Sequence, residues 1–239
     1  MTSSNSSYAA ICQRIDAAGR SAGHSAGLLA VSKLQPAAAI RTLAGLGQRR
    51  FGENYVQEAL AKQRELADLA LEWHLIGPLQ SNKCRDVATH FDWLESLDRE
   101  KLVAPLNQHR GAGRPPLNVL IQVNIDDEAG KAGCAPDAIA RLAALVAQAP
   151  RLQLRGLMAI PQPHPDFARR RAAFRRMRDL FDALRSDHAC ADTLSLGMSD
   201  DFELAIAEGA TQVRIGTALF GERQKDEGRG EKGKATGGR

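Results

Sequence analysis

Residues 117 to 123 read LNVLIQV, and they form the clearest strand pattern in the chain. The run is apolar and rich in β-branched residues, which favours a strand buried on both faces, as in a parallel sheet. An Ala- and Leu-rich stretch with helical character follows at 136–148. Short β-rich runs and helical patterns alternate in the same way along the sequence on both sides of this strand and helix. Such alternation predicts an α/β fold with a parallel sheet.

The alternation predicts eight strands, at residues 28–32, 50–53, 73–76, 93–97, 117–123, 154–160, 193–196 and 212–215. Helices are predicted at 36–47, 55–71, 81–89, 99–108, 136–148, 167–186 and 200–208, and an extra helix at 7–23 precedes the first strand. Eight βα units in 239 residues fit a single closed (β/α)8 TIM barrel. An open doubly wound sheet is the alternative. The first strand is followed by VSKLQP and not by G-x-G-x-x-G, which argues against that alternative.

The chain is expected to form one domain and a tail. The barrel with its N-terminal helix would occupy residues 1–221. Residues 222–239 read ERQKDEGRGEKGKATGGR and contain no apolar residue beyond alanine. Such a segment cannot bury enough surface to order itself, so we expect a disordered C-terminal tail.

Composition bounds the class of protein. The chain is 44% hydrophobic and 25% charged, which is typical of a soluble globular protein. Its net charge of +4 is mild, and no nucleic-acid motif accompanies the arginines at 169–178, so they are interpreted as a solvated helix face. Four cysteines without C-x-x-C spacing indicate neither a disulfide framework nor a metal site. No apolar run is long enough for a membrane span, and no signal peptide is present. We expect a cytoplasmic monomer that does not bind nucleic acid.

In a (β/α)8 barrel, functional side chains lie at the carboxyl ends of the strands. Lys33 follows the first strand, and a partly desolvated lysine has a lowered pKa and can attack an aldehyde. Ser199 follows the seventh strand and would cap a helix beginning near Asp200, where an anion is favoured. Gly216 and Thr217 offer a backbone N–H and a hydroxyl after the eighth strand. A lysine facing a phosphate clamp suits a phosphorylated aldehyde, either pyridoxal phosphate or a sugar phosphate.

Several motifs together resemble one family, the pyridoxal 5'-phosphate homeostasis proteins (YggS/PROSC family). They are LLAVSK (28–33), FGENYVQEAL (51–60), EWHLIGPLQSNK (72–83), LNVLIQVN (117–124), LRGLMAIP (154–161), LSLGMSDDFELAI (194–206) and VRIGTALFG (213–221). The resemblance implies a fold type III barrel related to the N-terminal domain of alanine racemase. It also implies pyridoxal 5'-phosphate as the cofactor.

The resemblance assigns a role to each site residue. Lys33 would be the Schiff-base lysine, and Asn54 would lie beside the cofactor ring. The phosphate ligands would be Ser199, Gly216 and Thr217. Arg214 would lie near the pyridine nitrogen, and because a guanidinium only donates hydrogen bonds it would keep that nitrogen unprotonated. Such a ring is a weaker electron sink.

The family's implied role is to hold, buffer or deliver pyridoxal phosphate, in some cases to apo-enzymes, without efficient turnover. A weak amino-acid racemase is the alternative, but racemisation needs an acid/base on each face of the substrate carbon. Lys33 could serve one face. The racemases place a tyrosine from a second domain on the other, and neither Tyr8 nor Tyr55 lies in such a domain, so no catalytic residue is assigned. An aldolase acting on a sugar phosphate is the third hypothesis.

Overall fold

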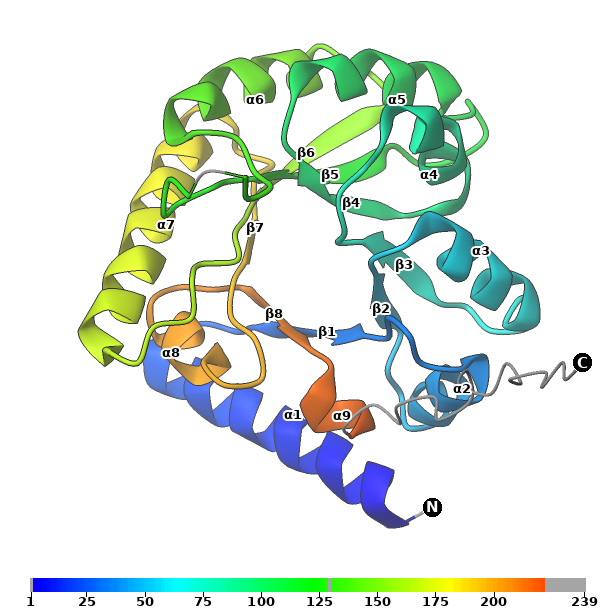
Figure 1. Cartoon of the computed structure of the whole chain (residues 1–239), viewed down its shortest axis with the longest axis vertical. Helices are drawn as coiled ribbons and strands as arrows, with labels where there is room; N and C mark the ends of the chain where they lie inside the picture. The colour runs from blue at the N-terminus through cyan, green and yellow to red at the C-terminus, as the bar shows by residue number, and fades with distance from the viewer. Residues whose placement is uncertain (1, 129, 222–239) are drawn as a thin grey trace, which may run out of the picture.

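The computed structural model describes residues 2–128 and 130–221, so the expected tail at 222–239 lies outside the described residues. Eight parallel strands close into a barrel in chain order, with β1 hydrogen-bonded to β8 (Figure 1). The expected (β/α)8 barrel is therefore confirmed. The strands are β1 (Gly27–Val31), β2 (Arg50–Glu53), β3 (Glu72–Leu75), β4 (Trp93–Leu97), β5 (Leu117–Gln122), β6 (Leu152–Met158), β7 (Thr193–Ser195) and β8 (Gln212–Ile215).

Helices surround the ring of strands (Figure 1). The α-helices are α1 (Thr2–Ala22), α2 (Ala37–Gly45), α3 (Val56–Glu65), α4 (Cys84–His90), α5 (Val103–His109), α6 (Ile139–Ala147), α7 (Phe167–Asp187), α8 (Phe202–Ala207) and α9 (Thr217–Phe220). Short 3-10 helices lie at η1 (Ser81–Lys83), η2 (Glu100–Leu102) and η3 (Pro136–Ala138). Among the described residues, no helix is both long and apolar enough to cross a membrane.

The helix predicted at 55–71 is shorter than expected. It ends at Glu65, although leucines continue at helical spacing to Leu69. Arg41 of α2 donates hydrogen bonds to the carboxylate of Asp68 and to the backbone carbonyl of Glu65, and these contacts hold a turn after the helix. The helical spacing of the leucines therefore predicted which residues pack against the barrel, but it did not predict where the helix ends.

The largest hydrophobic cluster lies between the strands and the helices, as a (β/α)8 barrel requires. A second, small cluster is made by Trp93, Leu120 and Met158. Inside such barrels, branched apolar side chains are the usual filling. Here buried polar side chains also occur on the strands, at His74, Glu95, Ser195, Gln212 and Arg214.

Ion pairs fasten the outer helices to one another. Arg14 of α1 contacts Glu203 of α8 with an N–O distance of 2.8 Å, and α1 lies alongside α8 and α9 (Figure 1). Arg171 and Arg175 of α7 both donate hydrogen bonds to Glu208, which follows α8. Part of the arginine-rich face of α7 is therefore used to bind the neighbouring helix.

Candidate functional site

A pocket of about 380 Å³ opens where the carboxyl ends of the strands meet. All six residues singled out from the sequence line it, namely Lys33, Asn54, Ser199, Arg214, Gly216 and Thr217. The backbone brings them together from strands β1, β2, β7 and β8, which adjoin one another in the closed barrel. Apolar walls complete the pocket, formed by Val31, Ile76, Pro78, Ile160 and Met198.

Lys33 is half-buried in a tight turn directly after β1. The next residue, Leu34, has a φ of 61°, and its N–H donates a hydrogen bond of 2.6 Å to Glu58 Oε1 on α3. Lys62 Nζ lies 2.6 Å from the same oxygen and donates a 2.7 Å hydrogen bond to the carbonyl of Ser32. The residues on both sides of Lys33 are therefore held by α3.

A buried ion pair supports this turn from behind. Lys62 Nζ contacts Glu53 Oε1 at 2.8 Å, and Ser32 Oγ donates a 2.6 Å hydrogen bond to the same carboxylate oxygen. The Lys62 side chain is only 7% exposed and that of Glu53 is fully buried. Burial raises the pKa of Glu53, although its bonds with Lys62 and Ser32 act in the opposite direction.

Asn54 is placed by the close approach of two loops. A Cβ atom on Gly77 would lie 2.2 Å from the carbonyl oxygen of Asn54, which no side chain could tolerate. Gly77 follows β3 and also lines the pocket. Because glycine lacks a Cβ, the loops after β2 and β3 can meet at the rim and hold Asn54 against the pocket.

The loops after β7 and β8 form another part of the pocket wall. Gly197 has a φ of 86°, and α8 packs so closely that a Cβ on Gly197 would lie 2.6 Å from Ala205 Cβ. The prediction that Ser199 caps a helix is wrong, because α8 begins at Phe202 with Asp201 as its N-cap residue. Met198 N–H donates to the Asp201 side chain, so the chain turns before the helix begins. Ser199 lies in that turn and still lines the pocket.

Gly216 is the N-cap residue of α9, a short helix that the sequence did not predict. Its four residues carry no recognisable apolar period, which is why the pattern missed it. Thr217 is the first residue of this helix, and both residues line the pocket.

Arg214 closes the pocket from inside the barrel and is 4% exposed. Its NH1 donates hydrogen bonds of 2.7 Å to the carbonyl and to the hydroxyl of Ser195, and its NH2 donates to the carbonyl of Ala159 at 2.7 Å. Burial lowers the pKa of Arg214, while the negative charges of Glu95 and Asp201 act in the opposite direction. A guanidinium remains charged at neutral pH even so.

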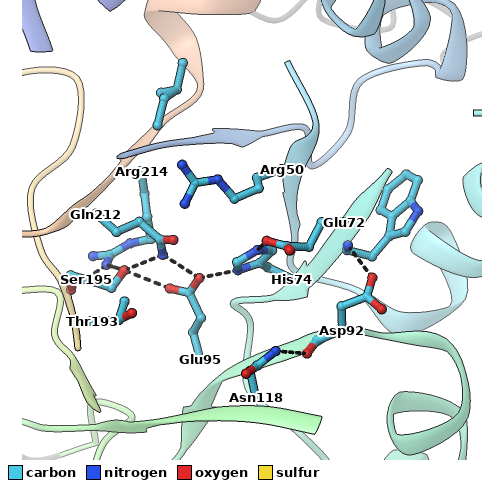
Figure 2. A network of polar contacts seen from close by, with 12 residues as sticks. Arg50, Glu72, His74, Asp92, Glu95, Asn118, Thr193, Ser195, Gln212 and Arg214 are labelled. Carbon is cyan, nitrogen blue, oxygen red and sulfur yellow. Dashed lines mark hydrogen bonds and ion pairs between the residues drawn. The ribbon is translucent and has the colours of Figure 1, made fainter. Parts of the chain in front are cut away.

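Sequence reasoning missed two groups of residues. Gln122 lines the pocket at the end of β5, and Glu95, Ser195 and Gln212 form the hydrogen-bonded layer beneath Arg214 (Figure 2). A signal was present, since Glu95 and Gln122 interrupt the apolar runs WLESL and LNVLIQV. A polar residue inside a strand that is buried on both faces needs a partner, and that partner lies toward the inside of the barrel. His74 also belongs to this layer, because its Nδ1 lies 2.7 Å from Glu95 Oε1.

Comparisons with known proteins find relatives that match most of the chain. A family model described as "Alanine racemase, N-terminal domain" matches residues 7–224. A pyridoxal phosphate homeostasis protein of Pseudomonas aeruginosa is 56% identical over 218 residues, which cover 90% of this chain and 94% of the relative. One from Escherichia coli K12 is 55% identical over 199 residues, covering 82% of this chain and 85% of the relative.

A solved structure extends the comparison to three dimensions. PipY of Synechococcus elongatus, with pyridoxal phosphate bound, matches with a TM-score of 0.81 and 39% identity. The match covers 91% of this chain and all of PipY, 100%. The family resemblance carried by the sequence motifs is thereby confirmed, and this chain belongs to the family of the pyridoxal phosphate homeostasis proteins.

Proposed function

We propose that this chain binds pyridoxal phosphate as a Schiff base on Lys33 and serves to hold and supply it. The observation that carries the proposal is that Lys33 and the loops after β7 and β8 line one pocket. The names of the relatives and the cofactor in PipY support the same ligand. They favour pyridoxal phosphate over the sugar phosphate that the isolated motifs also allowed.

The residues of the pocket fit each part of the cofactor. A primary amine at Lys33 can condense with the aldehyde. The hydroxyls of Ser199 and Thr217, with the backbone at Gly216, provide hydrogen-bond donors for a phosphate. The apolar walls suit an aromatic ring, and Arg214 can donate a hydrogen bond to the ring nitrogen. A volume of about 380 Å³ is ordinary for a small-molecule site.

Arg214 and Asn54 would orient the ring. When bound, pyridoxal phosphate supplies an aromatic system that can withdraw electrons from an attached amine. The charged guanidinium of Arg214 would hold the ring nitrogen without giving up a proton, which would weaken that withdrawal. Such an arrangement would favour binding without fast turnover.

The ionisable groups of the pocket support storage over racemisation. Among its described lining residues, the ionisable side chains are Lys33, Asp200 and Arg214. Tyr55 is 59% exposed and Tyr8 packs against the hydrophobic core, and neither lines the pocket. Asp200 adjoins the proposed phosphate ligand Ser199, on the wall formed by the loop after β7. Besides Lys33, the one carboxylate among these lining residues is Asp200, which adjoins the proposed phosphate ligand, and neither tyrosine is among them; this favours storage over racemisation, which needs an acid/base on each face of the substrate carbon.

The first test is the visible spectrum of the purified chain, followed by borohydride reduction and mapping of the labelled peptide. We expect a Schiff-base band and a pyridoxyl group fixed on Lys33. Lys33→Ala should lose both, while Lys101→Ala, which removes an exposed lysine, should keep both. A colourless wild-type protein that takes up no added pyridoxal phosphate would contradict the proposal.

A second assay separates storage from racemisation. The loaded protein is incubated with free amino acids in deuterated water, and exchange of the α-proton is followed by NMR. We expect exchange close to the rate with free pyridoxal phosphate alone. Transfer to recipients is followed by the activity gained by an apo-enzyme that depends on pyridoxal phosphate. Rapid exchange with inversion would establish the racemase instead.

A further inference from the structure

A chain of buried polar groups crosses the interior of the barrel (Figure 2). Its centre is Glu95 on β4, which is fully buried. Glu95 Oε1 lies 2.7 Å from His74 Nδ1 and accepts a 2.7 Å hydrogen bond from Gln212 Nε2. Glu95 Oε2 accepts a 2.8 Å hydrogen bond from Ser195 Oγ. Both oxygens of the carboxylate are therefore satisfied by side chains of three other strands.

One hydroxyl group separates this carboxylate from Arg214. Arg214 NH1 donates to Ser195 Oγ at 2.7 Å, and Ser195 Oγ donates in turn to Glu95. In the described part of the chain, Arg214 donates hydrogen bonds to two carbonyls and this hydroxyl, all of them neutral. Glu95 thus supplies a negative charge near the guanidinium without itself occupying any N–H donor of Arg214.

The other end of this network of polar groups, at Glu72, reaches the surface of the protein. His74 Nε2 lies 2.9 Å from Glu72 Oε1, and the Glu72 side chain is 40% exposed. The ring of Trp93 stacks on His74 with centroids 5.0 Å apart and planes 5° apart, which fixes the imidazole between the two carboxylates. From surface to pocket, acidic and basic side chains therefore alternate, in the order Glu72, His74, Glu95 and Arg214.

Each charged group in this network stabilises the charged form of its neighbour. Burial disfavours the charged imidazole, but the hydrogen bonds with Glu72 and Glu95 outweigh it and raise the pKa of His74. Burial also favours a neutral Glu95, yet His74 and Arg214 lower the pKa of that carboxyl. A buried ionic network is a poor source of stability compared with packed apolar residues. Its presence at this depth favours a role in the pocket above it.

We propose that Glu95 is a positioning residue for Arg214: acting through Ser195, and held by His74 and Gln212, it orients and electrically balances the guanidinium that forms the pocket floor. The inference rests on the proposed function, because Arg214 matters to a ligand only if the pocket holds one. Glu95 itself does not line the pocket and would not touch pyridoxal phosphate.

The test compares Glu95→Gln, Ser195→Ala and the double variant with the wild-type chain. The matched control is Glu208→Gln, which removes a largely buried carboxylate that pairs with Arg171 and Arg175 on α7. Two properties are measured on each full-length protein. One is the exchange rate of the Arg214 guanidinium protons by NMR without pyridoxal phosphate. The other is the dissociation constant of pyridoxal phosphate together with the absorbance maximum of the bound form.

We expect Glu95→Gln to speed the exchange of the Arg214 protons and to weaken pyridoxal phosphate binding about tenfold, with a shifted absorbance maximum. Ser195→Ala should act in the same direction. The double variant should lose less than the sum of the two single losses, because both changes break the same connection. Glu208→Gln should leave both properties at wild-type values.

Unchanged Arg214 exchange and unchanged binding in Glu95→Gln would overturn the proposal. So would fully additive losses, because Glu95 would then act independently of Ser195. If Glu95→Gln does not fold, Ser195→Ala decides the matter, and wild-type exchange in that variant counts against the proposal. A wild-type chain that takes up no pyridoxal phosphate would refute the proposed function alone, since the exchange measurement is made without the ligand.

Discussion

Lys62 of α3 helps to hold the turn around Lys33 through its contacts with Glu53, Glu58 and the carbonyl of Ser32. Lys62→Met would leave Glu53 buried without a cation, so we expect the free energy of unfolding to fall by about 3 kcal/mol. Because burial already raises the pKa of Glu53 above its unfolded value, protonation favours the folded state. The loss should therefore shrink as the pH is lowered from about 7 to about 5. Urea unfolding at both pH values checks this, with the exposed Lys101→Met as control, and a loss independent of pH would contradict it.

Helix α8 depends on Gly197, whose φ of 86° and lack of a Cβ let the helix pack against the end of β7. Gly197→Ala should destabilise the fold by about 2–4 kcal/mol, the sum of left-handed strain and a forced shift of α8. Gly47→Ala is the matched control, since Gly47 has a φ of 103° with nothing near its Cβ position and should lose only the strain. The shift should also weaken pyridoxal phosphate binding, because Ser199 lies between Gly197 and α8. Thermal unfolding and a binding titration measure both effects, and equal losses in the two variants would show that α8 does not press on Gly197.

The free energy of unfolding of the barrel should depend on pH through the buried pair of His74 and Glu95. The raised pKa of His74 means that its contribution to stability is fully present below its unfolded value of about 6.5 and is lost as the pH rises through the folded value. The lowered pKa of Glu95 has the opposite effect: its contribution to stability is lost as the pH falls through the pKa that it has in the folded protein. The charged groups that act on this pair are Glu72 and Arg214. His74→Gln should reduce the free energy of unfolding by about 3 kcal/mol at acidic to neutral pH and by progressively less above neutrality. Unfolding free energies across the pH range test this, and parallel curves for the two proteins would refute it.

The architecture and the six pocket residues could be predicted from the sequence, although the roles assigned to those residues stay predictions. Strands buried on both faces have a local signature, and in this fold their carboxyl ends mark the site. Lys33, Ser199 and Thr217 lie within a few residues of the carboxyl ends of β1, β7 and β8, so their position along the chain placed them at the mouth of the barrel. The role of Ser199 as a helix cap was wrong because the turn at Met198–Asp201 is closed by a side-chain contact that no period reveals.

By itself, the sequence determined the eightfold alternation, the closed barrel and the family, because each depends on local patterns and on motifs that are contiguous in the chain. Only the tertiary structure decided what fills the barrel. Glu95 and Ser195 are 100 residues apart, and Glu95 and Gln212 are 117 apart, yet they are hydrogen-bonded. The physical reason is that a buried carboxylate must find its donors among the side chains that the closed sheet brings next to it, and the local pattern of a strand does not say which distant side chains those are.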